Sequence, residues 1–109
     1  MLTCFDLKPG VSLKRFAAAV DAYAELMRER DLLATLGPIG RRARNTILDT
    51  DEDKSQEYFF LMGFRDRAQS DAAISLIESG PCEVTDVHRA MYALADNMVF
   101  LCWEDVTRP

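Results

Sequence analysis

The 109-residue chain is poor in the residues on which common catalytic and metal sites depend. It contains one histidine, His88, so a single chain does not supply a multi-histidine metal site. The patterns GxGxxG, GxxxxGK[ST], HExxH and GxSxG are all absent. The sequence therefore gives no support to nucleotide binding or hydrolysis, and we expect no metal and no other cofactor.

Cysteine is also scarce. The three cysteines, Cys4, Cys82 and Cys102, form no CxxC motif, and because their number is odd, at least one would stay unpaired in any disulfide pattern within the chain. This pattern indicates neither a disulfide framework nor a zinc site. We expect them to pack as small hydrophobic side chains.

Basic residues are outnumbered, 13 against 18 acidic, which gives a formal net charge of -5. An acidic chain is a poor ligand for nucleic acid or an anionic membrane, because both require a basic surface. No apolar run approaches the roughly 18 residues of a membrane-spanning helix. The beginning, MLTCFDLKPG, has neither the charged nor the long apolar region of a signal peptide, so we expect a cytoplasmic protein.

Periodicity predicts one α+β domain over residues 1–109. Two long helices are expected at residues 11–37, capped by Ser12, and 66–80, capped by Asp66. A shorter helix is expected near 85–94. Strands are expected at 2–7, 41–48, 57–64 and 98–106, the middle two joined by the polar turn 49–56. The order β-α-β-β-α-(α)-β is the ferredoxin-like arrangement.

The third and fourth of these strands carry large apolar residues on both faces. In the ferredoxin-like arrangement helices cover only one face of a four-stranded antiparallel sheet. The other face would expose hundreds of Å² of apolar surface, more than a soluble monomer usually tolerates. We therefore predict a homodimer in which two bare faces form an eight-stranded barrel around a two-fold axis.

Several segments resemble those of the dimeric α+β barrel superfamily, namely FDLKPG at 5–10, RR at 41–42, AQSDAA at 68–73, VH at 87–88 and FLCWED at 100–105. The superfamily includes stress-responsive barrel domains, cofactor-free monooxygenases and haem-degrading monooxygenases. The likeness points to an uncharacterised bacterial branch near the stress-responsive domains. It implies that Tyr23, Tyr58, Tyr92 and Trp103 could line a pocket for a flat organic molecule, although such aromatics mostly serve core and interface.

Arginines gather just before the polar turn. If the hairpin turns near Glu52–Asp53, Arg41 and Arg42 lie opposite Phe64 and Gly63, beside Arg65 and Arg67. Arg42 and Arg44 could then bind an anion at the barrel mouth. Alternatively, the arginines protect an edge strand and pair with the partner's Glu104 or Asp105.

Asp6 and His88 are the remaining candidates. Asp6 alternates with Leu2 and Cys4, which places it on the barrel side, where Arg44 or a tyrosine could pair with it or where it could act as a general base. A solvated strand end is a third reading. His88 invites comparison with a haem ligand, but a lone helix histidine more often bonds a backbone carbonyl.

The sequence thus predicts a homodimer that binds a small anionic or aromatic metabolite through Arg42, Arg44, Asp6, Tyr58 and Trp103. One alternative is a cofactor-independent monooxygenase or isomerase with Asp6, Tyr58 or His88 as acid/base groups. A second is a structural, stress-associated dimer without ligand, its cavity filled by its own aromatic side chains.

Overall fold

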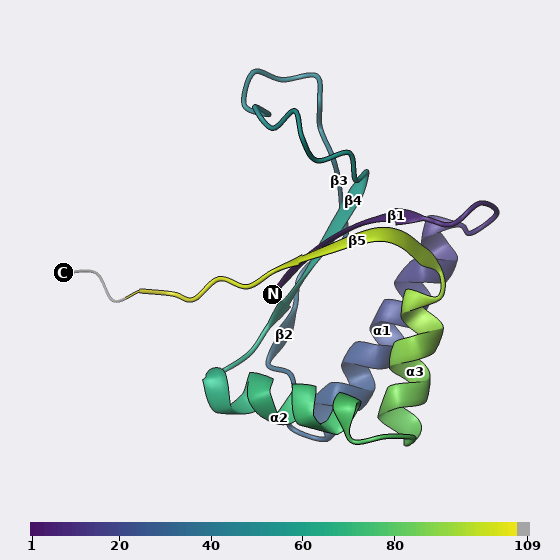
Figure 1. Cartoon of the computed structure of the whole chain (residues 1–109), viewed down its shortest axis with the longest axis vertical. Helices are drawn as coiled ribbons and strands as arrows, with labels where there is room; N and C mark the ends of the chain where they lie inside the picture. The colour runs from purple at the N-terminus through teal and green to yellow at the C-terminus, as the bar shows by residue number, and fades with distance from the viewer. Residues whose placement is uncertain (107–109) are drawn as a thin grey trace.

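The computed structural model describes residues 1–106 of the chain (Figure 1). Its elements in chain order are β1 (Leu2–Leu7), α1 (Leu13–Glu29), β2 (Thr35–Leu36), β3 (Gly40–Arg41), β4 (Tyr58–Gly63), α2 (Arg67–Glu78), α3 (Glu83–Tyr92) and β5 (Ala95–Leu101).

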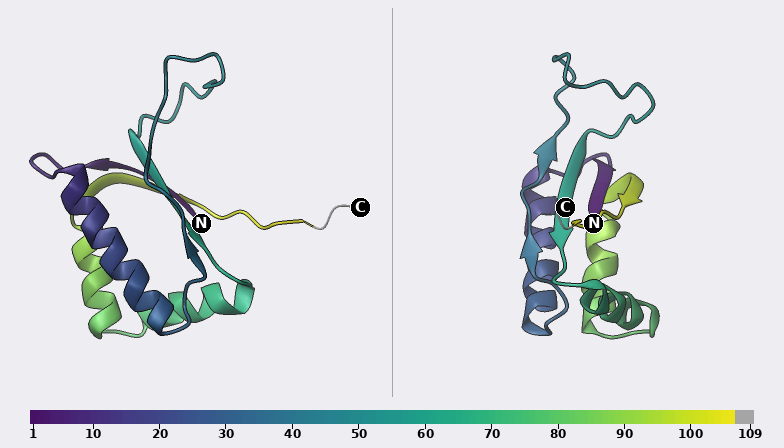
Figure 2. Two further views of the ribbon diagram at one scale, coloured as in Figure 1. Left: turned by 180° about the vertical axis from the view of Figure 1, so that it is seen from behind. Right: turned by 90° about the vertical axis from the view of Figure 1, so that its left-hand side faces the viewer.

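The strands form one antiparallel sheet in the order β2-β4-β1-β5, and β3 continues the edge of the sheet beside β4. All three helices lie on the same side of the sheet (Figure 2). The α+β class predicted from sequence is confirmed, and the strand order is consistent with the ferredoxin-like arrangement.

The core lies between the helices and the sheet face that they cover, here called the covered face. The helical spacing predicted this for α1, whose buried residues are Phe16, Val20, Tyr23, Ala24 and Met27. Phe5 of β1 and Phe60 of β4 meet Phe16, with ring centroids 4.5 and 6.1 Å from it. The two predicted helix caps are also confirmed, since Ser12 and Asp66 accept hydrogen bonds from the backbones of Arg15 and Gln69.

The first helix is shorter than predicted and ends at Glu29 instead of near Gly37. The chain turns at Asp31, which has a φ of 55° in the left-handed region. The amide of Leu32 bonds the carbonyl of Met27 at 2.8 Å, and that of Asp31 bonds Arg28 at 3.0 Å. These two bonds form a Schellman motif, which ends a helix. The left-handed residue of this motif is usually glycine, and because it is aspartate here, the end of the helix is not visible in the sequence.

The predicted strand at 41–48 is wrong, as is the predicted hairpin register. The edge strand begins earlier, at Thr35, and Pro38, which has no N–H to donate, separates β2 from β3. Arg41 lies opposite Tyr58, not Phe64. Arg41 and Arg42 are therefore at the opposite end of β4 from Arg65, and they do not join Arg65 and Arg67 as expected.

The second sheet face carries no helix and is here called the open face. Side chains along a strand alternate between the two faces. Thr3 and Phe5, both fully buried, lie on the covered face, so the residues next to them in β1, Leu2 and Cys4, lie on the open face. Position 40, in β3, requires glycine, because a Cβ added at this position would lie 2.0 Å from the ring of Phe59. The apolar side chains of the open face are Leu2, Cys4, Phe59, Leu61, Val99 and Leu101.

Two segments extend away from the body of the molecule (Figure 1). We call residues 43–57, between β3 and β4, the arm, and residues 102–106, after β5, the tail. The arm exposes Ile47 and Leu48, 94% and 87% accessible, and the tail exposes Trp103 at 77%. Apolar side chains this exposed are common singly, but these three lie in segments that project from the body of the molecule.

Candidate functional site

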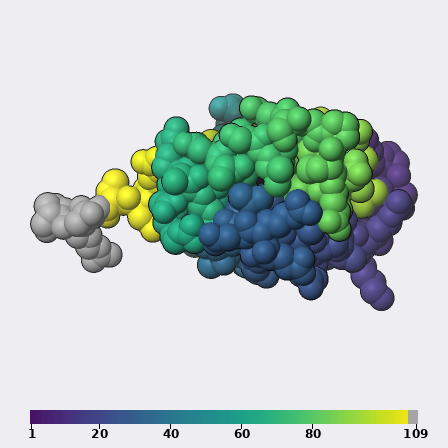
Figure 3. Space-filling model, turned by 90° about the horizontal axis from the view of Figure 1, so that it is seen from below, coloured from purple at the N-terminus to yellow at the C-terminus, as the bar shows by residue number. Residues whose placement is uncertain are grey.

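A cavity of about 450 Å³ lies between the covered face and the helices. From the helix side, α1 lies next to α2 and α3 (Figure 3). Most of the lining is apolar: Met27 from α1, Met62 from β4, Ala73 and Ile77 from α2, and Phe100 from β5. Its volume falls within the range of small-molecule sites.

Three polar aromatic side chains meet in this cavity. His88 and Tyr92 are four residues apart on α3 and therefore share a face, which is turned toward Tyr23 on the buried side of α1. The His88 ring lies 5.4 Å from that of Tyr23 and 4.8 Å from that of Tyr92, edge to face in both cases. Polar groups from two helices are thus gathered within an otherwise apolar space.

All three groups are neutral near pH 7. Burial raises the pKa of Tyr23 well above its ordinary value and that of Tyr92 to about 12. Burial lowers the pKa of His88 below its ordinary 6.5. Within residues 1–106, neither the Tyr23 hydroxyl nor the His88 ring has a hydrogen-bonded partner in the chain, although Tyr23 is only 3% exposed. These groups therefore remain free to bond a molecule in the cavity.

The cavity has few charged groups. Among residues 1–106, Glu78 is the one charged side chain of its lining, and the α-ammonium group of Met1, which also lines it, donates to the Met62 carbonyl at 2.7 Å. An anionic ligand would lose its hydration there without gaining a lysine or arginine as a partner. The arrangement suits a neutral ligand with a hydroxyl or carbonyl group.

Asp6 lies away from the cavity and joins the strand ends. Its two carboxylate oxygens accept hydrogen bonds from the Glu57 amide and the Asn97 side chain, both at 2.9 Å. The expected pairing with Arg44 or a tyrosine is wrong. The reason is that Arg44 belongs to the arm, where other carboxylates are nearer.

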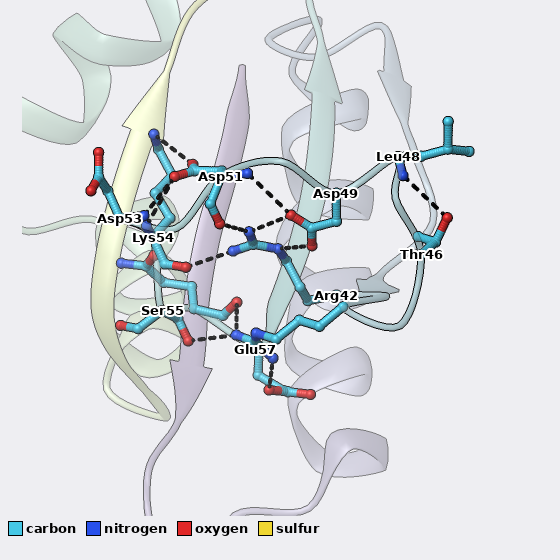
Figure 4. A network of polar contacts seen from close by, with 11 residues as sticks. Arg42, Thr46, Leu48, Asp49, Asp51, Asp53, Lys54, Ser55 and Glu57 are labelled. Carbon is cyan, nitrogen blue, oxygen red and sulfur yellow. Dashed lines mark hydrogen bonds and ion pairs between the residues drawn. The ribbon is translucent and has the colours of Figure 1, made fainter.

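Arg42 and Arg44 organise the arm (Figure 4). Arg42 pairs in bidentate fashion with Asp49 and also donates to the carbonyls of Asp51 and Lys54, each at 2.6 Å. Arg44 donates to the Glu57 carboxylate at 2.7 Å and to backbone carbonyls. The Arg42 guanidinium holds the pKa of Asp49 below its usual value. With these donors engaged inside the arm, a ligand-binding role for either arginine stays a prediction without geometric support.

Tyr58 and Trp103 also lie outside the cavity. Tyr58 faces the helices and stacks on Phe5 at 5.6 Å, and its hydroxyl accepts a 3.4 Å hydrogen bond from Arg41. Trp103, in the tail, lines a broader groove beside the start of α2, where Arg67 and Glu104 form an exposed ion pair at 3.2 Å.

The sequence identified Tyr23, His88 and Tyr92 separately, whereas it placed the expected ligand at the barrel mouth, away from this cavity; that placement stays a prediction. The available signal was their spacing, since Tyr23 falls on the apolar stripe of α1 and His88 is four residues before Tyr92. Among residues 1–106, no three histidine, cysteine or acidic side chains are grouped so as to hold a metal ion. No helix in the same range has the length and apolar character needed to cross a membrane.

Comparison with solved structures supports the fold. The crystal structure of At3g17210 from Arabidopsis thaliana matches with a TM-score of 0.71 over 99% of this chain and 95% of that one, at 13% sequence identity. A likeness at this identity concerns the fold alone. A search of curated proteins gave no match. A family model matches residues 2–109, so the chain belongs to DUF6614, a family of unknown function.

Proposed function

We propose that the protein binds a small, neutral, flat molecule, such as a phenol, in the cavity between the covered face and the helices. The observation that carries this proposal is the meeting of Tyr23, His88 and Tyr92, all neutral, in an apolar space of about 450 Å³. Binding sites of this type are mostly apolar, with a few polar groups that orient the ligand.

The lining favours an aromatic ligand over an anionic one. The ring edges of the three polar aromatics and the sulfur atoms of Met27 and Met62 make favourable contacts with a flat π-system. The lack of lysine and arginine in the lining disfavours a carboxylate or phosphate. Of the two ligand classes expected from sequence, the aromatic one is therefore retained.

The test is a titration with 1-naphthol, which is neutral near pH 7, followed by calorimetry and by NMR of the His88 ring. We expect saturable binding with His88 shifts, and weaker binding of the charged 1-naphthoate. Ala73→Leu fills the cavity, because Ala73 lines it and is 3% exposed, and should weaken binding about tenfold or more. Ala72→Leu, on the exposed side of α2, is the matched control. Absence of binding, or equal binding by both variants, would contradict the proposal.

A second candidate function is cofactor-independent proton transfer, as in an isomerase, with His88 as the base. Its support is the position of His88 in the cavity and its lowered pKa, which keeps the ring able to accept a proton. Asp6 and Tyr58 are not in the cavity and have no part in it. Deuterium washout from bound 2-tetralone, an enolisable aryl ketone, should be accelerated by the protein and lost in His88→Gln. Equal washout with and without protein would exclude this function for that substrate class.

We also propose that the protein is a homodimer formed through the open face, with two sheets making an eight-stranded barrel. The support is the set of six apolar side chains on a sheet face that carries no helix. A purely structural dimer with a cavity filled by its own side chains has less support, because about 450 Å³ of the cavity is left unfilled by them. Native mass spectrometry should give twice the chain mass, and a monomer at micromolar concentration would contradict the dimer.

A further inference from the structure

We infer that the arm, residues 43–57, is the second part of the dimer interface and that its tip, Ile47 and Leu48, packs against the partner subunit. The inference rests on the proposed dimer and adds to it a segment outside the sheet. The argument begins with the area of the open face.

The open face alone is too small for a stable dimer. Its main part has three strands and a short edge strand, β2 and β3 together. With strands about 4.8 Å apart and about 3.3 Å per residue, a face of about six residues by four strands covers about 400 Å². A stable interface buries about 800 Å² of accessible surface on each partner, which is more than this flat footprint even after the relief of the side chains is added. Surface outside the sheet, in the arm and in the tail with its exposed Trp103, would enlarge the contact.

The arm is positioned to supply it. It continues from the edge of the sheet and leans toward the side of the open face, as the first two figures show from opposite directions. A second copy placed on the open face therefore lies within reach of the arm. The same two-fold axis would bring the partner's arm to this protomer, so that the contact is made twice.

The arm has an ordered internal structure. Arg42, the residue just before the arm, bonds Asp49 and two carbonyls within it, and Asp51 accepts from the amides of Asp53 and Lys54. The Thr46 hydroxyl accepts from the Leu48 amide at 3.2 Å, which orders the tip (Figure 4). Because the arm is ordered before it docks, docking costs less conformational entropy.

The chemistry of the tip matches that of the open face. Ile47 and Leu48 are adjacent, uncharged and 94% and 87% exposed, within an otherwise polar arm. The carboxylates of Asp6 and Asp96, which are cross-strand partners, lie at the end of the open face; Asp6 is bonded to Glu57 and Asn97, and the centre of the face is apolar. A second copy of this chain therefore presents the surface that the tip requires, whereas a charged partner does not.

The test compares dimer dissociation constants by sedimentation equilibrium. Ile47→Asp/Leu48→Asp should weaken the dimer about a hundredfold or more, because two apolar anchors are lost from each of two arms. The control, Thr50→Asp/Ser55→Asp, adds the same charge to the same arm at exposed positions and should stay within about threefold of wild type. Ile47→Ala/Leu48→Ala should give an intermediate loss, and circular dichroism should show that each variant is folded.

The outcomes separate this inference from the proposed dimer. A wild-type dimer with tip variants that dissociate no more than the control would overturn the role of the arm and leave the open-face dimer standing. A wild-type monomer would overturn both. If the Asp variant does not fold, the Ala variant decides, and unchanged association of a folded Ala variant would refute the inference.

Discussion

Tyr23→Phe should make the protein more stable while weakening its binding of a phenol. Tyr23 is 3% exposed, and no described residue hydrogen-bonds its hydroxyl, which faces the cavity. A buried hydroxyl without a partner costs about 1–3 kcal/mol in proteins. The Tyr23 hydroxyl opens onto the cavity and, unlike Thr3 Oγ1, is not a fully buried atom without a partner, so we expect a smaller gain, about 0.5 kcal/mol, in the free energy of unfolding.

The binding change should have the opposite sign. If the hydroxyl orients the ligand, its removal should lower the affinity for 1-naphthol about tenfold, as loss of one uncharged hydrogen bond does. Urea unfolding followed by circular dichroism measures the first quantity, and calorimetric titration measures the second. Tyr58→Phe is the control, since its hydroxyl bonds Arg41 outside the cavity and its loss should leave binding unchanged.

A loss of stability in Tyr23→Phe would refute this reasoning, because it would mean that the hydroxyl has a partner within the folded chain. Unchanged binding together with raised stability would be a different failure. It would leave the cavity in place but remove Tyr23 from ligand recognition.

Three further predictions follow from the same features. Burial keeps the pKa of His88 in the folded protein below 6.5, so the unfolded chain binds more protons than the folded one as the pH falls through 6.5. The free energy of unfolding should therefore decrease with falling pH. Urea midpoints should show this decrease in the wild type and a smaller one in His88→Gln. Phe60→Ala removes a fully buried ring packed on Phe16 and should lower the unfolding free energy by about 3–5 kcal/mol, measured in the same way. Arg42→Ala removes the hydrogen bonds to Asp49 and two carbonyls, so amide exchange within the arm should accelerate while exchange in β4 stays slow; equal acceleration in both would contradict a local role.

Local patterns in the sequence predicted the regular elements well. The stripe of α1 and the caps at Ser12 and Asp66 depend on neighbours within four residues, and the structure confirms them. Alternation in the third strand predicted two apolar faces but not which of them meets the helices; the structure places Phe60 in the core, because side chains on a strand change face at every residue.

The errors concern features that depend on distant residues. The end of α1 at Asp31 depends on a left-handed residue that is not glycine. The edge strand begins at Thr35, which pairs with Gly63, and Arg42 is bonded to the carboxylate of Asp49 seven residues later, so the residues after Arg41 leave the sheet. Neither signal appears in hydrophobic periodicity.

The candidate site was harder still to predict. The cavity is formed by side chains from five elements, α1, β4, α2, α3 and β5, and no short stretch of sequence records that Tyr23 and His88 meet. The ligand was instead predicted to bind Arg42 and Arg44 because of their charge. In the structure these arginines pair with the carboxylates of Asp49 and Glu57.

The alternation of β4 has a consequence for how this protein can change over time. Phe59 and Leu61 point to the proposed partner, whereas Phe60 and Met62 point to the core and cavity. Odd and even positions can therefore vary independently, so that ligand preference and assembly are separately adjustable by point substitution. Insertion of a single residue in β4 has no such freedom, because it would exchange the two sets and disturb ligand binding and assembly together.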